Sequence, residues 1–375
     1  MAVLTEEQSM IRDGAKSWVQ EKSPVTAFRK LRDSGNPDGF DRAVWAEMAE
    51  MGWAGILIPE EFGGTGLGYV TLGLVLEETG RTLTASPLIS TALTATTALL
   101  LAGSEAQKGK YLSAIAAGEL VATLAVDEGP HHAPEKIALK GEKAGSGIKL
   151  NGKKTFVLDG SVADLIIVAA RTSGKPGDKG GITLALVDGK APGLSREALK
   201  TVDSRGYANL TFKDVEGEVL GAFDQGQGVL ETTLDRARAG LAAEMLGHAA
   251  QSFDVTLEYL KTREQFGQKI GTFQALQHRA AKMFTDLELG RSCVEGALAA
   301  IDRDANDVAQ LASLAKAKVG DLVHLVSNEM VQMHGGIGMT DAHEAGFYLK
   351  RARAQEATFG NQSYHRDRYA TLLGY

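Results

Sequence analysis

The sequence REQFG at residues 263–267 and the sequence QMHGGIG at residues 332–338 are the most informative part of this chain. Both lie at the ends of long, Ala-rich runs with apolar residues at helical spacing: residues 230–260, 273–302 and 308–334, with a fourth run after Glu344. Helices of this length pack as an antiparallel bundle, because each buries one apolar face against its neighbours. The last third of the chain is therefore predicted to be a four-helix bundle that carries both motifs.

Length and composition limit the classes of protein to which the chain can belong. A chain of 375 residues with 44% hydrophobic and 23% charged residues predicts two or three packed units. Its net charge of −7 disfavours a nucleic-acid partner. The N-terminus shows no signal peptide, and the apolar run at residues 88–101 is too short to span a bilayer. With Cys293 as its one cysteine, we expect a cytoplasmic protein with no membrane segment and no internal disulfide.

The chain divides into three segments, and the fold class is predicted to be α+β. Residues 1–122 are expected to be helical, with Thr5 and Ser104 as N-caps. Residues 123–226 contain short runs of β-forming residues separated by Gly and Pro, which is typical of a small barrel or sandwich. Within them, Asn151-Gly152 between two extended runs predicts a hairpin turn. Residues 227–375 form the predicted bundle.

Two features whose residue types are common in ion- or phosphate-binding sites are interpreted as structural. The Gly- and Lys-rich residues 171–180 are predicted to be a surface loop and not a phosphate cradle, because no helix follows them. The pair His131-His132 has no third ligand nearby in the sequence. We therefore expect no metal.

The order of helices, β segment and bundle, together with the motifs it carries, resembles the acyl-CoA dehydrogenase family along the whole chain. The blocks that carry the resemblance are MGWAGILIPEEFGGTG at 51–66, LNGKK at 150–154, REQFGQKI at 263–270 and QMHGGIG at 332–338. The resemblance implies an N-terminal α domain (1–122), a central small β-barrel or sandwich (123–226) and a C-terminal bundle (227–375). It also implies FAD as cofactor, an acyl-CoA thioester as substrate and electron-transferring flavoprotein as acceptor.

In the family, the two C-terminal motifs hold the ADP half of FAD across a dimer interface. A guanidinium binds phosphate oxygens in a bidentate manner, Phe266 offers a flat apolar surface, and glycines let the backbone approach the cofactor. The alternatives are a solvated charge for Arg263, a core position for Phe266 and a plain helix stop for the glycines. The resemblance implies these cofactor-binding residues: Arg263, Gln265, Phe266, Ile270, Phe273, Gln274, Gln332, Gly335, Gly336 and, beside the flavin ring, Phe156.

The flavin half of the site departs from the family pattern. The family offers hydroxyl groups to the flavin at two positions that here are Val126 and Leu158. A buried flavin heteroatom without its partner costs about 1–3 kcal/mol. These changes weaken the chain's own flavin site and leave intact the motifs that it would lend to a neighbour.

The catalytic base also departs from the pattern. Dehydrogenation needs a carboxylate to remove the acyl α-proton, and the two positions where the family places it are Gly360 and Ala237. Arg238, next to the second position, is the expected substrate-binding residue. Glu244 and Glu356 are weak candidates for the base, because a hydrogen bond between helices explains Glu244 and a surface ion pair with Arg353 or Arg351 explains Glu356.

Residues 338–352 resemble a bacterial subgroup whose members form two-subunit dehydrogenases for bulky CoA thioesters such as steroid side chains. The chain is therefore expected to be the base-lacking subunit of a homo- or hetero-tetramer, arranged as a dimer of dimers. Two alternatives remain open: a non-dehydrogenating, homo-oligomeric CoA- or flavin-binding protein, and a flavoenzyme of this fold with other chemistry.

Overall fold

The computed structural model describes residues 4–375. Contacts between Cα atoms divide the chain into two compact units, which are considered separately. We call Met1–Arg29, Gly73–Thr84 and Arg238–Tyr375 the bundle unit, and Lys30–Leu72 with Ala85–Ala237 the sheet unit. The helices of residues 1–122 are thus distributed over both units. The division into three domains with boundaries near 122 and 226 stays a prediction.

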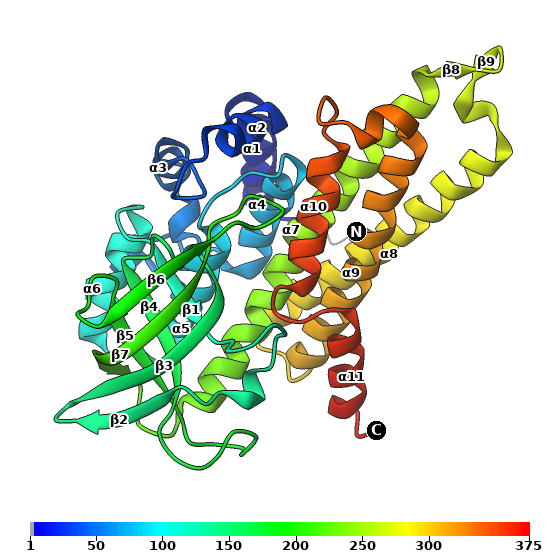
Figure 1. Cartoon of the computed structure of the whole chain (residues 1–375). Helices are drawn as coiled ribbons and strands as arrows, with labels where there is room; N and C mark the ends of the chain where they lie inside the picture. Colours follow the sequence, from blue (N-terminus) through cyan, green and yellow to red (C-terminus); the bar gives the residue numbers. More distant parts are fainter. Residues whose placement is uncertain (1–3) are drawn as a thin grey trace. The chain divides into compact units, whose positions relative to one another are not determined.

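The bundle unit is helical (Figure 1). Its central helix is α9 (Val308–His334), which coincides with a predicted run and packs against α8, α10 and α11. The other helices that contribute to the unit are α1 (Glu6–Lys22), α2 (Val25–Ser34), α4 (Gly68–Arg81), α7 (Gly226–Thr262), α8 (Gln274–Asp302), α10 (Ala345–Ala357) and α11 (Gln362–Leu372). The prediction of long helices in the last third of the chain is confirmed, and the run after Glu344 is two helices.

Two predicted helix starts are confirmed by their capping contacts. The Thr5 hydroxyl accepts a hydrogen bond from the Gln8 backbone N–H, while the Gln8 side chain accepts one from the Thr5 N–H. Ser104 and Gln107 form the same reciprocal pair at the start of α6 (Glu105–Ala116). Each pair satisfies N–H groups that have no partner inside the helix.

The sheet unit combines helices with a seven-stranded sheet. Its remaining helices are α3 (Arg42–Glu50) and α5 (Thr96–Ala102), with short turns η1 (Trp53–Gly55), η2 (Glu60–Phe62) and η4 (Pro134–Lys136) and a π-helix, η3 (Leu88–Ala95). Its strands are β1 (Ala122–Ala125), β2 (Lys140–Ala144), β3 (Gly147–Leu158), β4 (Leu165–Arg171), β5 (Ile182–Asp188), β6 (Leu194–Leu199) and β7 (Tyr207–Leu220).

The sheet closes on itself, as expected for a small barrel. The strand order is β1-β4-β2-β3-β7-β5, β6 pairs with β7, and β4 also pairs with β5. Side chains of alternate residues fill the interior, among them Ile166, Val168, Leu210 and Phe212. The predicted α+β class with a small β-barrel and a C-terminal helical bundle is confirmed.

The predicted hairpin turn at Asn151-Gly152 is wrong. β3 runs without a break from Gly147 to Leu158, and the turn lies earlier, where Ala144 pairs with Gly147. Gly152 instead lies at a bulge between β3 and β7, with φ of +144°. Glycine suits a bulge as well as a turn because it lacks a Cβ, so the dipeptide alone did not distinguish the two.

The apolar run that begins at Leu88 is a buried π-helix followed by α5. All eight residues of η3 are buried. The Thr94 hydroxyl donates to the Ile89 carbonyl, five residues back, and Thr96 does the same to Thr91. Among the described residues, no helix is long and apolar enough to cross a bilayer.

Candidate functional site

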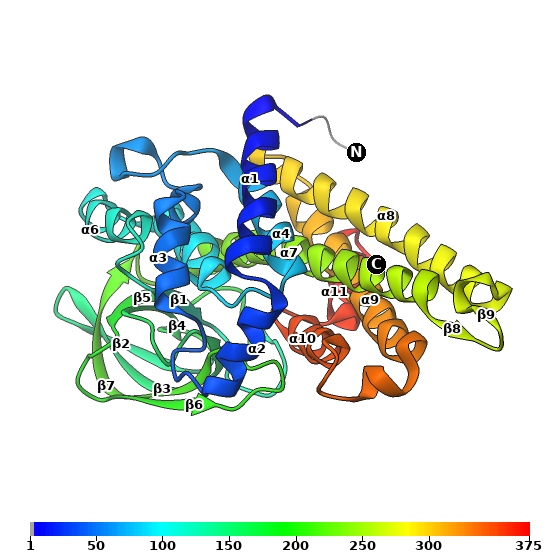
Figure 2. The same ribbon diagram turned by 90° about the horizontal axis from the view of Figure 1, so that it is seen from above.

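The REQFG motif forms a small hairpin beyond the ends of α7 and α8 (Figures 1 and 2). Its strands are β8 (Glu264–Gln265) and β9 (Gln268–Lys269), and Phe266 and Gly267 form the two-residue turn, both with positive φ. This is the conformation of a type I′ turn, which a Phe rarely adopts. The Phe266 side chain is 91% exposed. The alternative of a core position is therefore excluded within this chain, and an apolar ring at an exposed, strained position favours a binding role.

Arg263 lies at the base of this hairpin. Its backbone N–H donates to Tyr259 O, and its carbonyl accepts from Ile270 N–H. Its side chain is exposed, and no hydrogen bond or ion pair of its guanidinium is found within residues 4–375. The adjacent carboxylate of Glu264 is occupied by Lys269 at 2.6 Å. The guanidinium of Arg263 is thus available to an anionic group from outside the chain.

The other predicted cofactor residues of this segment surround the hairpin. The Phe273 ring lies perpendicular to the Phe266 ring, with 6.2 Å between centroids. The Gln265 amide donates to the Glu264 carbonyl, Ile270 opens the turn η5 (Ile270–Thr272), and Gln274 begins α8. The structure brings all six predicted residues of this segment to one end of the bundle unit.

The second motif lies at the same end. The His334 ring at the end of α9 packs 4.3 Å from the Tyr259 ring, one turn before Arg263. Gly335 has φ of +63°, and a Cβ built on Gly335 or Gly336 would meet no atom within 4 Å. The two glycines therefore leave accessible backbone beside open space, next to the exposed Gln332. Only glycine adopts this conformation without strain, so Gly335 also explains the helix end.

The sheet unit carries the other predicted positions. Phe156 is 54% exposed with φ of +50°, whereas Val126 and Leu158 are buried and offer no hydroxyl. Within the segment from Val126 to Ala133, the Asp127 carboxylate accepts from the Ala133 N–H and lies 2.9 Å from His132 Nδ1. At this place the chain has a turn closed by the Asp127–His132 contact, and the side chains of Val126 and Leu158 offer no hydroxyl donor.

A buried lysine fixes the same segment. Lys154 is fully buried, and its Nζ lies 2.7 Å from Glu128 Oε1 and 2.8 Å from Val126 O. Burial lowers the pKa of Lys154, while the Glu128 carboxylate opposes that shift. Sequence reasoning missed this pair. As for metals, the described residues contain no cluster of three ligating side chains, and His132 is occupied by Asp127.

The two glutamates considered as substitutes for the base are each engaged in other contacts. Glu244 is buried, and its Oε1 accepts from Gln355 Nε2 at 2.7 Å. Glu356 lies 2.5 Å from Arg353 and 3.1 Å from His324. These contacts are those expected of an interhelix hydrogen bond and an ion pair, and neither glutamate is assigned a catalytic role.

Gly360 lies in the turn between α10 and α11, and Arg238 and Lys316 hold this turn. Arg238 is buried, and its Nε donates to Phe359 O at 3.3 Å. Lys316 Nζ donates to Gly360 O at 2.9 Å and to the carbonyls of Gln355 and Glu356 at the end of α10. Ala237 is buried on α7. The assignment of Arg238 to substrate binding stays a prediction.

Burial without a full ion pair lowers the pKa of Lys316 from 10.5 to about 7. Between these values the folded chain carries a neutral amine while the unfolded chain carries an ammonium, so stability rises with pH from about 7 to about 10.5. Lys316→Met should remove this rise, which denaturant unfolding of both proteins at several pH values will measure. Lys318→Met is the control, because it removes another lysine of α9, one that is paired with Asp286 of α8. If the free energy of unfolding varies with pH in the same way in wild type and Lys316→Met, the lowered pKa of Lys316 is contradicted.

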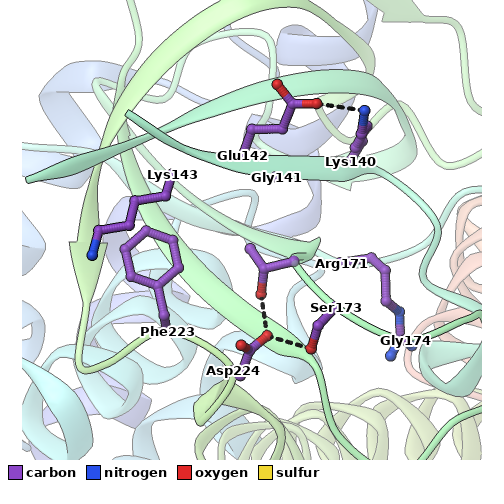
Figure 3. Close-up of a pocket in the computed structure, with 10 residues that line it drawn as sticks. Lys140, Gly141, Glu142, Lys143, Arg171, Ser173, Gly174, Phe223 and Asp224 are labelled. Atoms are coloured by element: carbon purple, nitrogen blue, oxygen red, sulfur yellow. Dashed lines mark hydrogen bonds and ion pairs between the residues drawn. The ribbon is translucent and has the colours of Figure 1, made fainter. Parts of the chain in front are cut away.

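A pocket of about 500 Å³ opens on the sheet unit beside the loop at 171–180 (Figure 3). The Arg171 guanidinium at its edge donates to the carbonyls of Ile137 and Gly180. The Asp224 carboxylate accepts from Thr172 and Ser173, and these hydroxyls lower its pKa. A strand, β5, follows the loop. The arrangement disfavours a phosphate, in agreement with the sequence, and the pocket contains none of the predicted site residues.

The comparisons with known proteins agree with this geometry. Three family models cover nearly the whole chain: Acyl-CoA dehydrogenase, N-terminal domain over residues 5–119, middle domain over 132–215 and C-terminal domain over 224–373. The chain belongs to the acyl-CoA dehydrogenase family. Acyl-CoA dehydrogenases are FAD-dependent oxidoreductases, and FAD is the cofactor that this chain is built to contact.

Individual acyl-CoA dehydrogenases are similar to this chain along nearly its full length. Mitochondrial isovaleryl-CoA dehydrogenase of Pongo abelii is 34% identical over 381 residues, 97% of this chain and 88% of that protein. Mitochondrial short/branched chain specific acyl-CoA dehydrogenase of Bos taurus is 28% identical and covers 94% of this chain and 82% of its own. A solved structure of a variant of the Tcur3481-Tcur3483 steroid ACAD is 31% identical, with a TM-score of 0.89 and 98% coverage of both chains.

The residues present fit FAD at one end and not at the other. The exposed Arg263, Phe266 and accessible backbone of Gly335 suit the pyrophosphate and the adenine ring in the ADP half of FAD. When bound, FAD supplies hydride-accepting chemistry to the family. In the sheet unit, buried Val126 and Leu158 supply no donor for polar flavin atoms. The residues expected to contact FAD therefore suit its ADP half better than its flavin half.

Proposed function

We propose that this chain is the base-lacking subunit of a heteromeric, FAD-dependent acyl-CoA dehydrogenase. In this role it completes the FAD site of a second, base-carrying subunit through Arg263, Phe266 and the Gly335–Gly336 backbone. The reaction of the complex is the α,β-dehydrogenation of an acyl-CoA thioester. We further propose a tetramer arranged as a dimer of dimers, a cytoplasmic location and electron-transferring flavoprotein as acceptor.

The observation that carries this proposal is the contrast between the two halves of the chain's own cofactor contacts. The hairpin tip is presented to solvent, with an exposed Phe266 and an Arg263 whose guanidinium has no hydrogen bond or ion pair within the described residues, as expected of groups that reach a neighbour. The segment that would contact the chain's own flavin is instead occupied by the pairs Asp127–His132 and Glu128–Lys154. These features are expected of a subunit that contacts the FAD bound to its partner and binds no flavin of its own.

The steroid ACAD match supports a heteromer of this kind, since its name joins two gene products. That enzyme is said to act on a steroid, and for this chain a bulky acyl-CoA stays part of the proposal. The mitochondrial relatives act on short or branched acyl-CoA, as their names state. The acyl group therefore has to be determined by experiment.

Flavin content and assembly test the proposal together. We expect the chain purified alone to contain little FAD. After co-expression with a base-carrying acyl-CoA dehydrogenase subunit from the same organism, we expect a yellow complex of four subunits. Absorbance at the flavin band and the mass from light scattering at micromolar concentration measure both. Stoichiometric FAD in the chain alone, or a monomer under all conditions, would contradict it.

A further inference from the structure

The turn between α10 and α11 is held at two consecutive carbonyls. Phe359 O accepts from Arg238 Nε at 3.3 Å and from His365 Nε2 at 3.0 Å, and Gly360 O accepts from Lys316 Nζ at 2.9 Å. Both turn residues have positive φ, +56° at Phe359 and +103° at Gly360. The turn is therefore fixed by three donors from three helices, and its backbone conformation favours glycine at position 360.

The space in front of Gly360 is occupied by an aromatic ring. A Cβ on Gly360 would lie 2.4 Å from Tyr364 Cδ1, 3.0 Å from Tyr364 Cε1 and 2.9 Å from His365 Nε2. Non-bonded carbon atoms do not approach one another to 2.4 Å, because protein interiors are already packed at contact distance. Any side chain at position 360 therefore requires the Tyr364 ring, which makes the shortest contact, to move, together with a smaller shift of His365.

That ring is held on several sides. The Tyr364 hydroxyl accepts from Arg238 Nη2 at 3.2 Å, and the guanidinium carbon lies 5.6 Å from the ring centroid. The ring packs edge-on against His365, with 5.1 Å between centroids. The Tyr364 N–H donates to Asn361 Oδ1, which caps α11. Displacing the ring would break contacts with a buried arginine and a buried histidine.

We propose that Tyr364 closes the position at which the family places its proton-abstracting glutamate, so that this position is filled and not simply vacant. The inference rests on the proposed function, because it takes Gly360 as the matching position. Tyr364 then determines whether a carboxylate introduced at position 360 can reach an acyl α-proton. A carboxylate at position 360 requires a second change, at position 364.

A double-mutant cycle on stability tests the closure without substrate or cofactor. We expect Gly360→Ala to lower the melting temperature by about 4 °C more in the wild-type background than in Tyr364→Ala, because only the former contains the overlapping ring. Gly346→Ala on α10 is the matched control, since a Cβ there meets no atom within 4 Å. It should give the same shift in both backgrounds.

The outcomes of the cycle are decisive in both directions. Equal shifts for Gly360→Ala in both backgrounds would overturn the closure. If Gly360→Ala does not fold alone, folding of the double variant supports the closure, and failure of both overturns it, because the obstacle then lies elsewhere than Tyr364.

The chemical consequence is tested by exchange of the acyl α-proton with deuterated water. In this step the α-C–H bond breaks, the proton passes to the carboxylate, the electron pair stays in the thioester enolate, and a deuteron returns. With butyryl-CoA as probe, Gly360→Glu/Tyr364→Ala should exchange at least about 10-fold faster than Gly360→Glu, measured by mass spectrometry. Equal, measurable rates would overturn the closure. No exchange in either variant, with the stability coupling intact, would leave the closure standing and count against acyl-CoA as the ligand of this chain.

Discussion

The purified chain, supplied with FAD, a panel of acyl-CoA thioesters and an artificial electron acceptor, should turn over at least about 100-fold more slowly than the ~1 s⁻¹ at the lower end of ordinary enzymes. In the proposed assignment, Gly360 and Ala237 occupy both positions at which the family places its base, and a positioned base contributes about 10²–10⁴-fold. Glu244 and Glu356, the nearest substitutes considered, are already hydrogen-bonded or ion-paired. Reduction of the acceptor, followed by absorbance, measures the rate.

The complex with the base-carrying subunit, assayed under the same conditions, is the positive control. Turnover near 1 s⁻¹ by the isolated chain would show that a carboxylate of this chain acts as base. Glu244→Gln and Glu356→Gln would then identify which one, since each replaces the carboxylate by an amide of nearly the same shape. Gly360→Glu alone should restore little, because its backbone conformation is strained for any residue with a Cβ.

Arg263→Ala should cause the assembled complex to lose most of its FAD. The exposed guanidinium has no competing partner in the described chain, and a bidentate, charge-assisted contact to phosphate contributes about 1.5–3 kcal/mol, a factor of about 10–150 in affinity. FAD content after gel filtration, and the dissociation constant from flavin fluorescence, measure the change.

Lys261→Ala is the matched control, because it removes a positive charge from the same end of α7 where Lys261 pairs with Glu258 at 2.6 Å. Arg263→Lys separates charge from geometry, since an ammonium keeps the charge and loses the bidentate contact. Equal FAD retention in wild type and Arg263→Ala would exclude Arg263 from cofactor binding.

Features that depend on residues close together in the sequence could be predicted from it. The capping pairs at Thr5 and Ser104, and the bounds of α9, follow from side chains within a turn or from helical spacing. The hairpin turn predicted from Asn151-Gly152 was wrong because glycine suits both a turn and a bulge, and only the pairing with β7 decides between them. Local patterns are reliable where the competing structures differ locally.

The candidate site could be predicted only where its residues form contiguous motifs. Arg263, Phe266 and Gly335 lie in such motifs, whereas Lys316 and Tyr364 act through contacts with a turn far from Lys316 in the chain. A lysine within the apolar run of α9 was the available signal for Lys316, because a buried amine requires carbonyl or carboxylate partners. Nothing in the sequence around Tyr364 indicates that its ring faces Gly360.

The exposed tip at Phe266 also has a consequence for the cell that makes this protein. In the proposed heteromer, the Phe266 side chain, 91% exposed at the end of a hairpin, is apolar surface that stays uncovered until a partner binds, and uncovered apolar surface favours aggregation and degradation. Newly synthesised subunits would therefore survive in proportion to the partners available to cover them. Synthesis of both polypeptides from one transcript would match their numbers, and surplus copies of either would be removed by degradation.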